Sequence, residues 1–172
     1  FQAEDGIRDY YASRGLGEVY KRQVLSYNYG AGQMQRVRAG IRFMSAAAMV
    51  YTFCAWLFAM FQPRLLCRIF TPDEAMVEAS VRMLRVYFAG FFFQSFQFCG
   101  QSVFQSLGWA KYAITFSLLR KVVIVVPLTL LLPVVGLGTT GVFLAEPISN
   151  IVGGLACYIT MLCTAYKQMG RE

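Results

Sequence analysis

The sequence predicts an all-α, polytopic membrane protein with four membrane-spanning helices. Hydrophobic residues make up 57% of its 172 residues and charged residues only 15%, whereas soluble domains have about 45–50% and about 25%. Long stretches carry no charge, and most lysines and arginines flank these stretches. A chain with so few charges cannot cover a soluble surface, so we expect lipid to surround much of it.

Long apolar runs place the four spans, because a spanning helix needs about 20 apolar residues. We expect them at residues 43–62, 86–108, 112–132 and 141–166. The third run contains Arg120 and Lys121, and the fourth contains Glu146. A buried helix of a soluble protein can be as apolar, but four such runs in one short chain favour a membrane. The strict alternation typical of an outer-membrane barrel is missing.

The loop charges predict the orientation. The net charge is +7, and cations gather before the first span, between the second and third spans, and after the fourth span: Arg36, Arg38, Arg42, Lys111, Lys167 and Arg171. The positive-inside rule then places both ends of 24–172 in the cytoplasm, in a multi-pass protein of the cell inner (plasma) membrane. Because the cations flank apolar runs instead of forming a known module, no nucleic-acid partner is expected.

The loop between the first two spans holds Arg64 and Arg68, which three nearby acids offset. Its motif Thr71-Pro72-Asp73-Glu74 predicts a helix start with Thr71 as the N-cap, Pro at the first helical position and acids in the first turn. We expect a short interfacial helix there, leading into the second span.

The segment Phe1–Gln23 differs from the rest of the chain. It carries four acids and four bases, so the whole net charge of +7 belongs to residues 24–172. It has no apolar period and no signal-peptide core. Its RDYYASRGLGEVYKRQ stretch resembles translated adaptor sequence that contaminates assembled metagenomes. We interpret the segment as unrelated to the rest, an assembly artefact, with a genuine polar tail as the alternative.

No residue pattern predicts an enzyme. The chain lacks histidine, its five cysteines form no CxxC pair, and no phosphate-binding loop is complete. We expect the cysteines, most of which lie inside apolar runs, to be small buried hydrophobes. No catalytic residues, metal site or cofactors are predicted.

Polar side chains line one face of the second predicted span. At about 100° per residue, Gln94, Gln97, Gln101 and Gln105 share an arc of about 80°. Glutamine side chains are costly against lipid, so this stripe faces protein or a water-filled cavity. It is either hydrogen-bonding glue between helices or part of a substrate or ion pathway.

The fourth span repeats the pattern with Glu146 and Asn150 on one face. Glu146 is the only acid inside a predicted span and is a candidate proton carrier. The alternative is that Glu146 lies near the end of its helix, where its carboxylate extends to the membrane interface or pairs with a cation. Of Arg120 and Lys121, one can extend to the interface, and the other needs an acid or a carbonyl as a partner. Pro127 predicts a bend in the third span.

The order of short motifs resembles the multidrug and toxic compound extrusion (MATE) transporters. The matching elements are Tyr27-Asn28-Tyr29-Gly30-Ala31-Gly32 followed by Arg36 and Arg42, Phe70–Asp73, Gln105-Ser106-Leu107-Gly108, Arg120 with Pro127, and Gly141–Ser149. The resemblance covers 24–172. It implies that this segment is the C-terminal part of the C-lobe of a twelve-helix, two-lobe transporter.

Members of that family export organic cations and other compounds by alternating access, driven by Na⁺ or H⁺. The resemblance therefore implies a fragment of a cation-coupled multidrug efflux antiporter, whose partners are the lipid bilayer and small organic, often cationic, substrates. No obligate protein partner is predicted. The substrate or ion pathway would include Gln94, Gln97, Gln101, Arg120, Glu146 and Asn150, with Arg120 near the cytoplasmic mouth.

Two departures from the family pattern affect the coupling ion, which we leave as Na⁺ or H⁺. Some members carry a cation-binding Asp in the stretch that corresponds to Phe93–Phe104, which has glutamines and no acid here. Many have Asp where this chain has Asn150. The main coupling acid is thus expected to lie in the missing half. The alternatives are a lipid-linked precursor flippase of the same superfamily, and a non-transporting four-helix membrane scaffold subunit.

Overall fold

The computed structural model describes residues 22–169, so the interpretation of Phe1–Gln23 falls almost wholly outside the described residues. Residues 22–30 are helical. The helices that follow, where η marks π-helical turns, are α2 (Met34–Phe61), α3 (Pro63–Phe70), α4 (Glu74–Phe88), α5 (Phe91–Ser106), α6 (Ala110–Leu118), η1 (Leu119–Val125), α7 (Val126–Leu132), η2 (Pro133–Leu137), α8 (Gly138–Met161) and η3 (Leu162–Tyr166).

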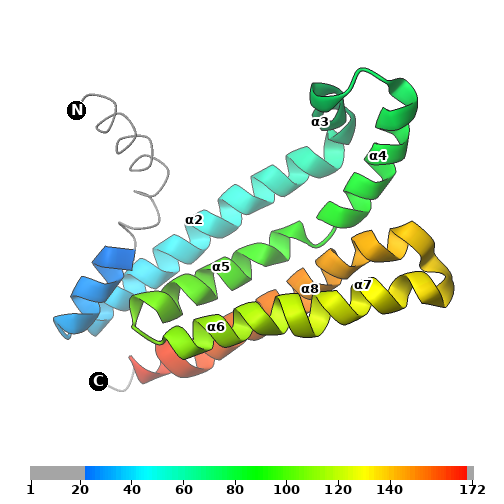
Figure 1. Cartoon of the computed structure of the whole chain (residues 1–172). Helices are drawn as coiled ribbons and strands as arrows, with labels where there is room; N and C mark the ends of the chain where they lie inside the picture. The colour runs from blue at the N-terminus through cyan, green and yellow to red at the C-terminus, as the bar shows by residue number, and fades with distance from the viewer. Residues whose placement is uncertain (1–21, 170–172) are drawn as a thin grey trace, which may run out of the picture.

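The long helices lie side by side in an elongated bundle (Figure 1). α5 packs between α2 and α8, and the rod made by α6, η1 and α7 packs along α8. Helix 22–30, the α5–α6 turn and the C-terminal end of α8 gather at one end of the bundle, which we call the terminal end. α3 and the α7–α8 turn lie at the other, which we call the distal end.

Two helical runs in the described chain are long and apolar enough to cross a membrane, Met34–Phe61 and Ala110–Tyr166. The second is two antiparallel rods, because the chain reverses at Gly136 and Gly138, whose φ values of +103° and +51° suit glycine. α4 and α5, with 15 and 16 residues, are separated at Ala89-Gly90. The expected run 86–108 therefore contains a break that the sequence did not predict.

The connection between α2 and α4 differs from the sequence expectation. The connection contains a short helix, α3. The N-cap of α4 is Asp73 and not Thr71: the Asp73 carboxylate accepts a hydrogen bond from the Ala75 backbone N–H at 3.0 Å. The prediction of Thr71 as the cap is wrong because α4 begins at Glu74, so Asp73 and not Thr71 directly precedes the first helical turn. Thr71 is extended (φ −149°, ψ 137°).

The α5–α8 contact depends on small residues. A Cβ on Gly154 would meet the carbonyl oxygen of Phe93, and a Cβ on Gly100 would lie 2.7 Å from Cys157 Sγ. A Cβ on Gly90, in the turn before α5, would lie 2.5 Å from the carbonyl oxygen of Pro147. Small residues let helices in a bilayer approach closely, and van der Waals packing then holds them together.

Large apolar side chains on the outer faces are exposed, such as Phe43 (78%) and Leu130 (67%), as lipid-facing residues would be. The buried apolar cluster lies towards the terminal end, where Phe104 stacks on Tyr112 and Phe116. Within the described chain none of the five cysteines forms a disulfide. The expectation of burial holds for Cys67, Cys99 and Cys157 but is wrong for Cys54 and Cys163, because their helices turn these side chains outward.

Candidate functional site

A cavity of about 170 Å³ lies between α5 and the rod made by α6 and η1. Three of the four glutamines of the predicted stripe line it, because they are one helical turn apart on the same face of α5. The opposite wall carries a hydroxyl and two cations. The lining residues are Gln94, Gln97, Phe98, Gln101, Ser117, Arg120 and Lys121.

The wall formed by η1 is fastened to α8 by charged and polar contacts. Arg120 Nη1 donates a hydrogen bond of 2.6 Å to Asn150 Oδ1, and Arg120 Nη2 lies 3.6 Å from Glu146 Oε1. Lys121 Nζ lies 3.2 Å from the same oxygen. Arg120 therefore has the acid partner that a cation inside a span requires, and Glu146 is paired with two cations.

Burial separates the members of this charged cluster. The Arg120 and Glu146 side chains are 9% and 15% exposed, whereas that of Lys121 is 55% exposed. Gly153 makes room for the arginine, because a Cβ there would lie 3.1 Å from Arg120 Cγ. With one acid and two bases, the cluster has a formal charge of +1, so it offers no net attraction to a second cation.

Two buried polar atoms beside the cavity lack a hydrogen-bond partner in the described part of the chain, Gln97 Oε1 and Arg120 Nε. Both residues line the cavity and are more than nine-tenths buried. Buried polar atoms are nearly always hydrogen-bonded. The cavity wall can thus offer both an acceptor and a donor to a polar ligand.

The six residues predicted for the pathway fall into one assembly of three elements. Gln94, Gln97 and Gln101 line the cavity from α5, Arg120 lines it from η1, and Glu146 and Asn150 hold Arg120 from α8. Gln105, which completed the sequence stripe, is exposed and does not line the cavity.

Sequence reasoning left out three lining residues, Phe98, Ser117 and Lys121. Lys121 could have been included, since a second cation beside a buried one inside an apolar run is itself a signal. Phe98 and Ser117 carry no such signal. In residues 22–169 no three of the Cys, Asp and Glu side chains are grouped closely enough to hold a metal ion.

The MatE family model matches residues 22–131, which is more than half of the chain. The chain belongs to the MatE family. This confirms the family resemblance and, with it, the prediction of an all-α polytopic membrane protein. The number of spans stays a prediction.

Solved structures resemble the MatE chain closely. The MATE multidrug transporter DinF-BH, in complex with R6G, is 28% identical over 86% of this chain and 34% of its own, with a TM-score of 0.76. A structure described as "protein A" is 30% identical over 80% of this chain and 31% of its own, with a TM-score of 0.74.

The inward-facing conformation of a multidrug resistance MATE family transporter of the MOP superfamily has a TM-score of 0.80 over 90% of this chain and 36% of its own, and its 16% identity supports the fold alone. The MatE chain thus spans about a third of the length of each of these three solved chains. No curated protein matches it.

Proposed function

We propose that this MatE chain is the C-terminal part of the C-lobe of a cation-coupled efflux antiporter that exports small organic compounds by alternating access. One observation carries the proposal: in a chain of this family, a cavity and a charged cluster join three otherwise apolar helical elements. Polar and ionisable groups are costly at membrane depth and mark transport pathways. A scaffold subunit would use such groups only as hydrogen-bonding contacts between its helices, and it would have no use for a cavity lined by them.

In this proposal the glutamines of α5 contact the transported compound. Gln94, Gln97 and Gln101 present amide donors and acceptors at one wall of the cavity. Amides suit a range of polar compounds, since each carries donors and an acceptor and no charge. Phe98 adds an aromatic surface to the same wall.

Glu146 would act through its pairing and not as an open ion site. Its carboxylate contacts Arg120 and Lys121, so a coupling Na⁺ or proton has to compete with two resident cations. We infer that the main coupling acid lies elsewhere in the complete transporter, and that Glu146 holds η1 against α8 until these helices move apart.

The test is ion-driven efflux of R6G, the compound bound in the DinF-BH structure, by the complete transporter reconstituted in liposomes. Glu146→Gln removes the charge that pairs with both cations, and we expect slower efflux with the response to a Na⁺ or proton gradient retained. Glu74→Gln is the matched control, because Glu74 pairs with Arg68 on the surface. An unchanged rate and coupling in Glu146→Gln would remove Glu146 from the mechanism.

The formal charge of +1 on the cluster favours a second candidate, a flippase for lipid-linked precursors, whose anionic phosphates suit a cationic cavity. The two functions separate in one comparison. Translocation of a lipid-linked sugar phosphate without R6G efflux would replace the antiporter proposal. Counting the helices of the complete transporter is a second test, since such flippases usually have two more.

For the orientation, we propose that both ends of 24–172 lie in the cytoplasm. The described ends lie together at the terminal end (Figure 1), close in sequence to the cations of the positive-inside argument. In intact cells and a cysteine-free background, a membrane-impermeant maleimide should label Thr139→Cys, in the exposed turn at the distal end, but not Gln33→Cys at the terminal end. The reverse pattern would invert the assignment.

A further inference from the structure

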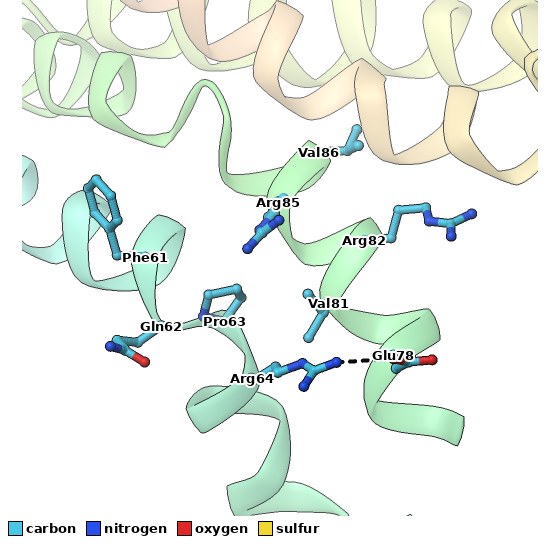
Figure 2. A pocket seen from close by; sticks show the side chains of 9 residues that line it. All are labelled: Phe61, Gln62, Pro63, Arg64, Glu78, Val81, Arg82, Arg85 and Val86. Atoms are coloured by element: carbon cyan, nitrogen blue, oxygen red, sulfur yellow. Dashed lines mark hydrogen bonds and ion pairs between the residues drawn. The ribbon is translucent and has the colours of Figure 1, made fainter. Parts of the chain in front are cut away.

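A second, larger cavity lies at the distal end of the bundle, away from the glutamine-lined site. It has a volume of about 670 Å³ and is bordered by the end of α2, the start of α3 and one face of α4 (Figure 2). Its residues take no part in the proposed transport pathway. The lining residues that matter below are Phe61, Arg64, Glu78, Arg82, Arg85 and Val86.

Three arginines and one acid line this cavity. Glu78, Arg82 and Arg85 share one face of α4, because they are spaced by four and then three residues. Arg64 Nη2 contacts Glu78 Oε1 at 3.0 Å, the dashed line of Figure 2. Figure 2 also shows the Arg85 side chain directed from α4 into the space beside Pro63.

The acid neutralises only one of the arginines. Arg82 and Arg85 have no carboxylate partner among residues 22–169, so the lining has a formal charge of 3 − 1 = +2. A guanidinium group offers donors in a planar fork that matches the oxygens of a phosphate. Both guanidinium groups start from one face of α4, but in Figure 2 the Arg85 side chain points towards Pro63 whereas the Arg82 side chain points away from it. An anion that contacts both therefore requires the exposed Arg82 side chain to change rotamer.

Apolar surface borders the same cations. Phe61, at the end of α2, is 75% exposed, and Val81 and Val86 lie on the α4 side of the cavity. A ligand that fits both features carries a phosphate at one end and hydrocarbon at the other. Basic pockets between transmembrane helices on the cytoplasmic side of a membrane bind anionic lipid head groups, and the same pairing of guanidinium with phosphate is available at the opposite face.

We propose that the distal cavity binds the phosphate head group of a membrane phospholipid, held by Arg82 and Arg85, with its acyl chains against Phe61 and Val86. The cations are unexpected if this end faces away from the cytoplasm, because the positive-inside rule depletes lysine and arginine there. A bound anionic lipid accounts for them. The site does not depend on the transport function, and its test measures lipid binding alone.

The experiment uses the complete transporter in detergent, with native mass spectrometry to count bound lipids during titration. The probes are dioleoyl phosphatidylglycerol, dioleoylglycerol, which lacks the phosphate, and inorganic phosphate. We expect the phosphatidylglycerol Kd to rise about tenfold or more in Arg82→Gln/Arg85→Gln, the loss of about 1.4 kcal/mol or more. Glu78→Gln should lower the Kd a few-fold, because it removes the only negative charge of the lining.

Arg68→Gln is the control, since Arg68 pairs with Glu74 outside the cavity and its loss should leave the Kd unchanged. Arg82→Lys/Arg85→Lys keeps the charge without the fork, and an intermediate Kd in a folded variant supports phosphate recognition. Equal phosphatidylglycerol binding by the wild type and the Gln double variant, or equal binding of dioleoylglycerol, would overturn the proposal. Thermal stabilisation by inorganic phosphate without lipid would assign the site to free phosphate and overturn the lipid assignment.

Discussion

Replacing Gly100 with alanine tests the close contact between α5 and α8. The new Cβ would lie 2.7 Å from Cys157 Sγ, whereas ordinary contact begins at about 3.4 Å. The two helices must therefore move apart, or the thiol must move away from the new Cβ, by about 3.4 − 2.7 = 0.7 Å. Overpacking of this kind costs about 1–3 kcal/mol. A Gly→Ala change also raises helix propensity by about 1 kcal/mol, so the reference must be a second Gly→Ala variant.

Gly30→Ala is that reference, because Gly30 is helical and a Cβ there would meet nothing within 4 Å. We expect Gly100→Ala to be about 1–3 kcal/mol less stable than Gly30→Ala. Cys157→Ala should relieve the clash, because removing the thiol leaves the carbonyl oxygen at 3.2 Å as the nearest atom. The remaining shift is then about 0.2 Å, and the double variant should cost less than the sum of the two single variants.

The assay is reversible unfolding in mixed micelles of increasing SDS content. The wild type, Gly100→Ala, Cys157→Ala and the double variant form a double-mutant cycle. The Cys157 thiol also contacts the Gln97 carbonyl at 3.9 Å, a weak contact whose loss appears in the single variant and cancels in the cycle. Strictly additive costs, or equal stability of Gly100→Ala and Gly30→Ala, would refute the tight α5–α8 packing.

Three further predictions concern separate features. Arg120→Met should lower the free energy of unfolding by about 1.5–3 kcal/mol, because it removes the charged hydrogen bond to Asn150. Lys121→Met should lower it by only about 0–1 kcal/mol, because the Lys121 side chain is half-exposed. Both are measured by SDS unfolding, and equal costs would contradict the difference in burial. Asp73→Ala should speed amide hydrogen exchange in the first turn of α4, because the Asp73 cap stabilises that turn by about 0.5–2 kcal/mol. Unchanged exchange rates would show that Asp73 does not cap α4. Gly136→Ala should lower the free energy of unfolding by about 1–3 kcal/mol through backbone strain alone, since φ is +103° and a Cβ there would meet nothing within 4 Å. An unchanged stability in the same unfolding assay would contradict that turn geometry.

Much of the candidate site follows from the sequence, because membrane burial makes every polar residue costly. The positions of Gln94, Gln97 and Gln101 on one face depend only on helical periodicity, and all three line the cavity. The need of Arg120 for an acid partner is likewise local chemistry. That Glu146 and Asn150 supply the partners was out of reach, because it depends on the register between two antiparallel helices, which the reversal after α7 determines.

The breaks inside the helices were harder to predict. Ala89-Gly90 interrupts an apolar run with no proline nearby in the sequence, and the feature that distinguishes the turn is a tertiary one, the close approach of Gly90 to Pro147 on α8. Gln105 shares the angular position of the other glutamines, but it lies at the end of α5, where its helix no longer borders the cavity. Periodicity gives direction around a helix axis and says nothing of what lies beside each turn.

The π-helical turn η1 (Leu119–Val125) sets the angular register of the residues that follow it. A π turn takes one more residue than an α-helical turn and occurs mostly as a single-turn bulge inside an α-helix. Residues beyond Val125 are thus rotated by about 100° from where a continuous α-helix would place them. A chain with one residue fewer in η1 could not present Arg120 and Lys121 to α8 while keeping the present lipid-facing side of α7. Deleting one residue within Leu119–Val125 would therefore separate the charged cluster on η1 from the lipid-facing side of α7.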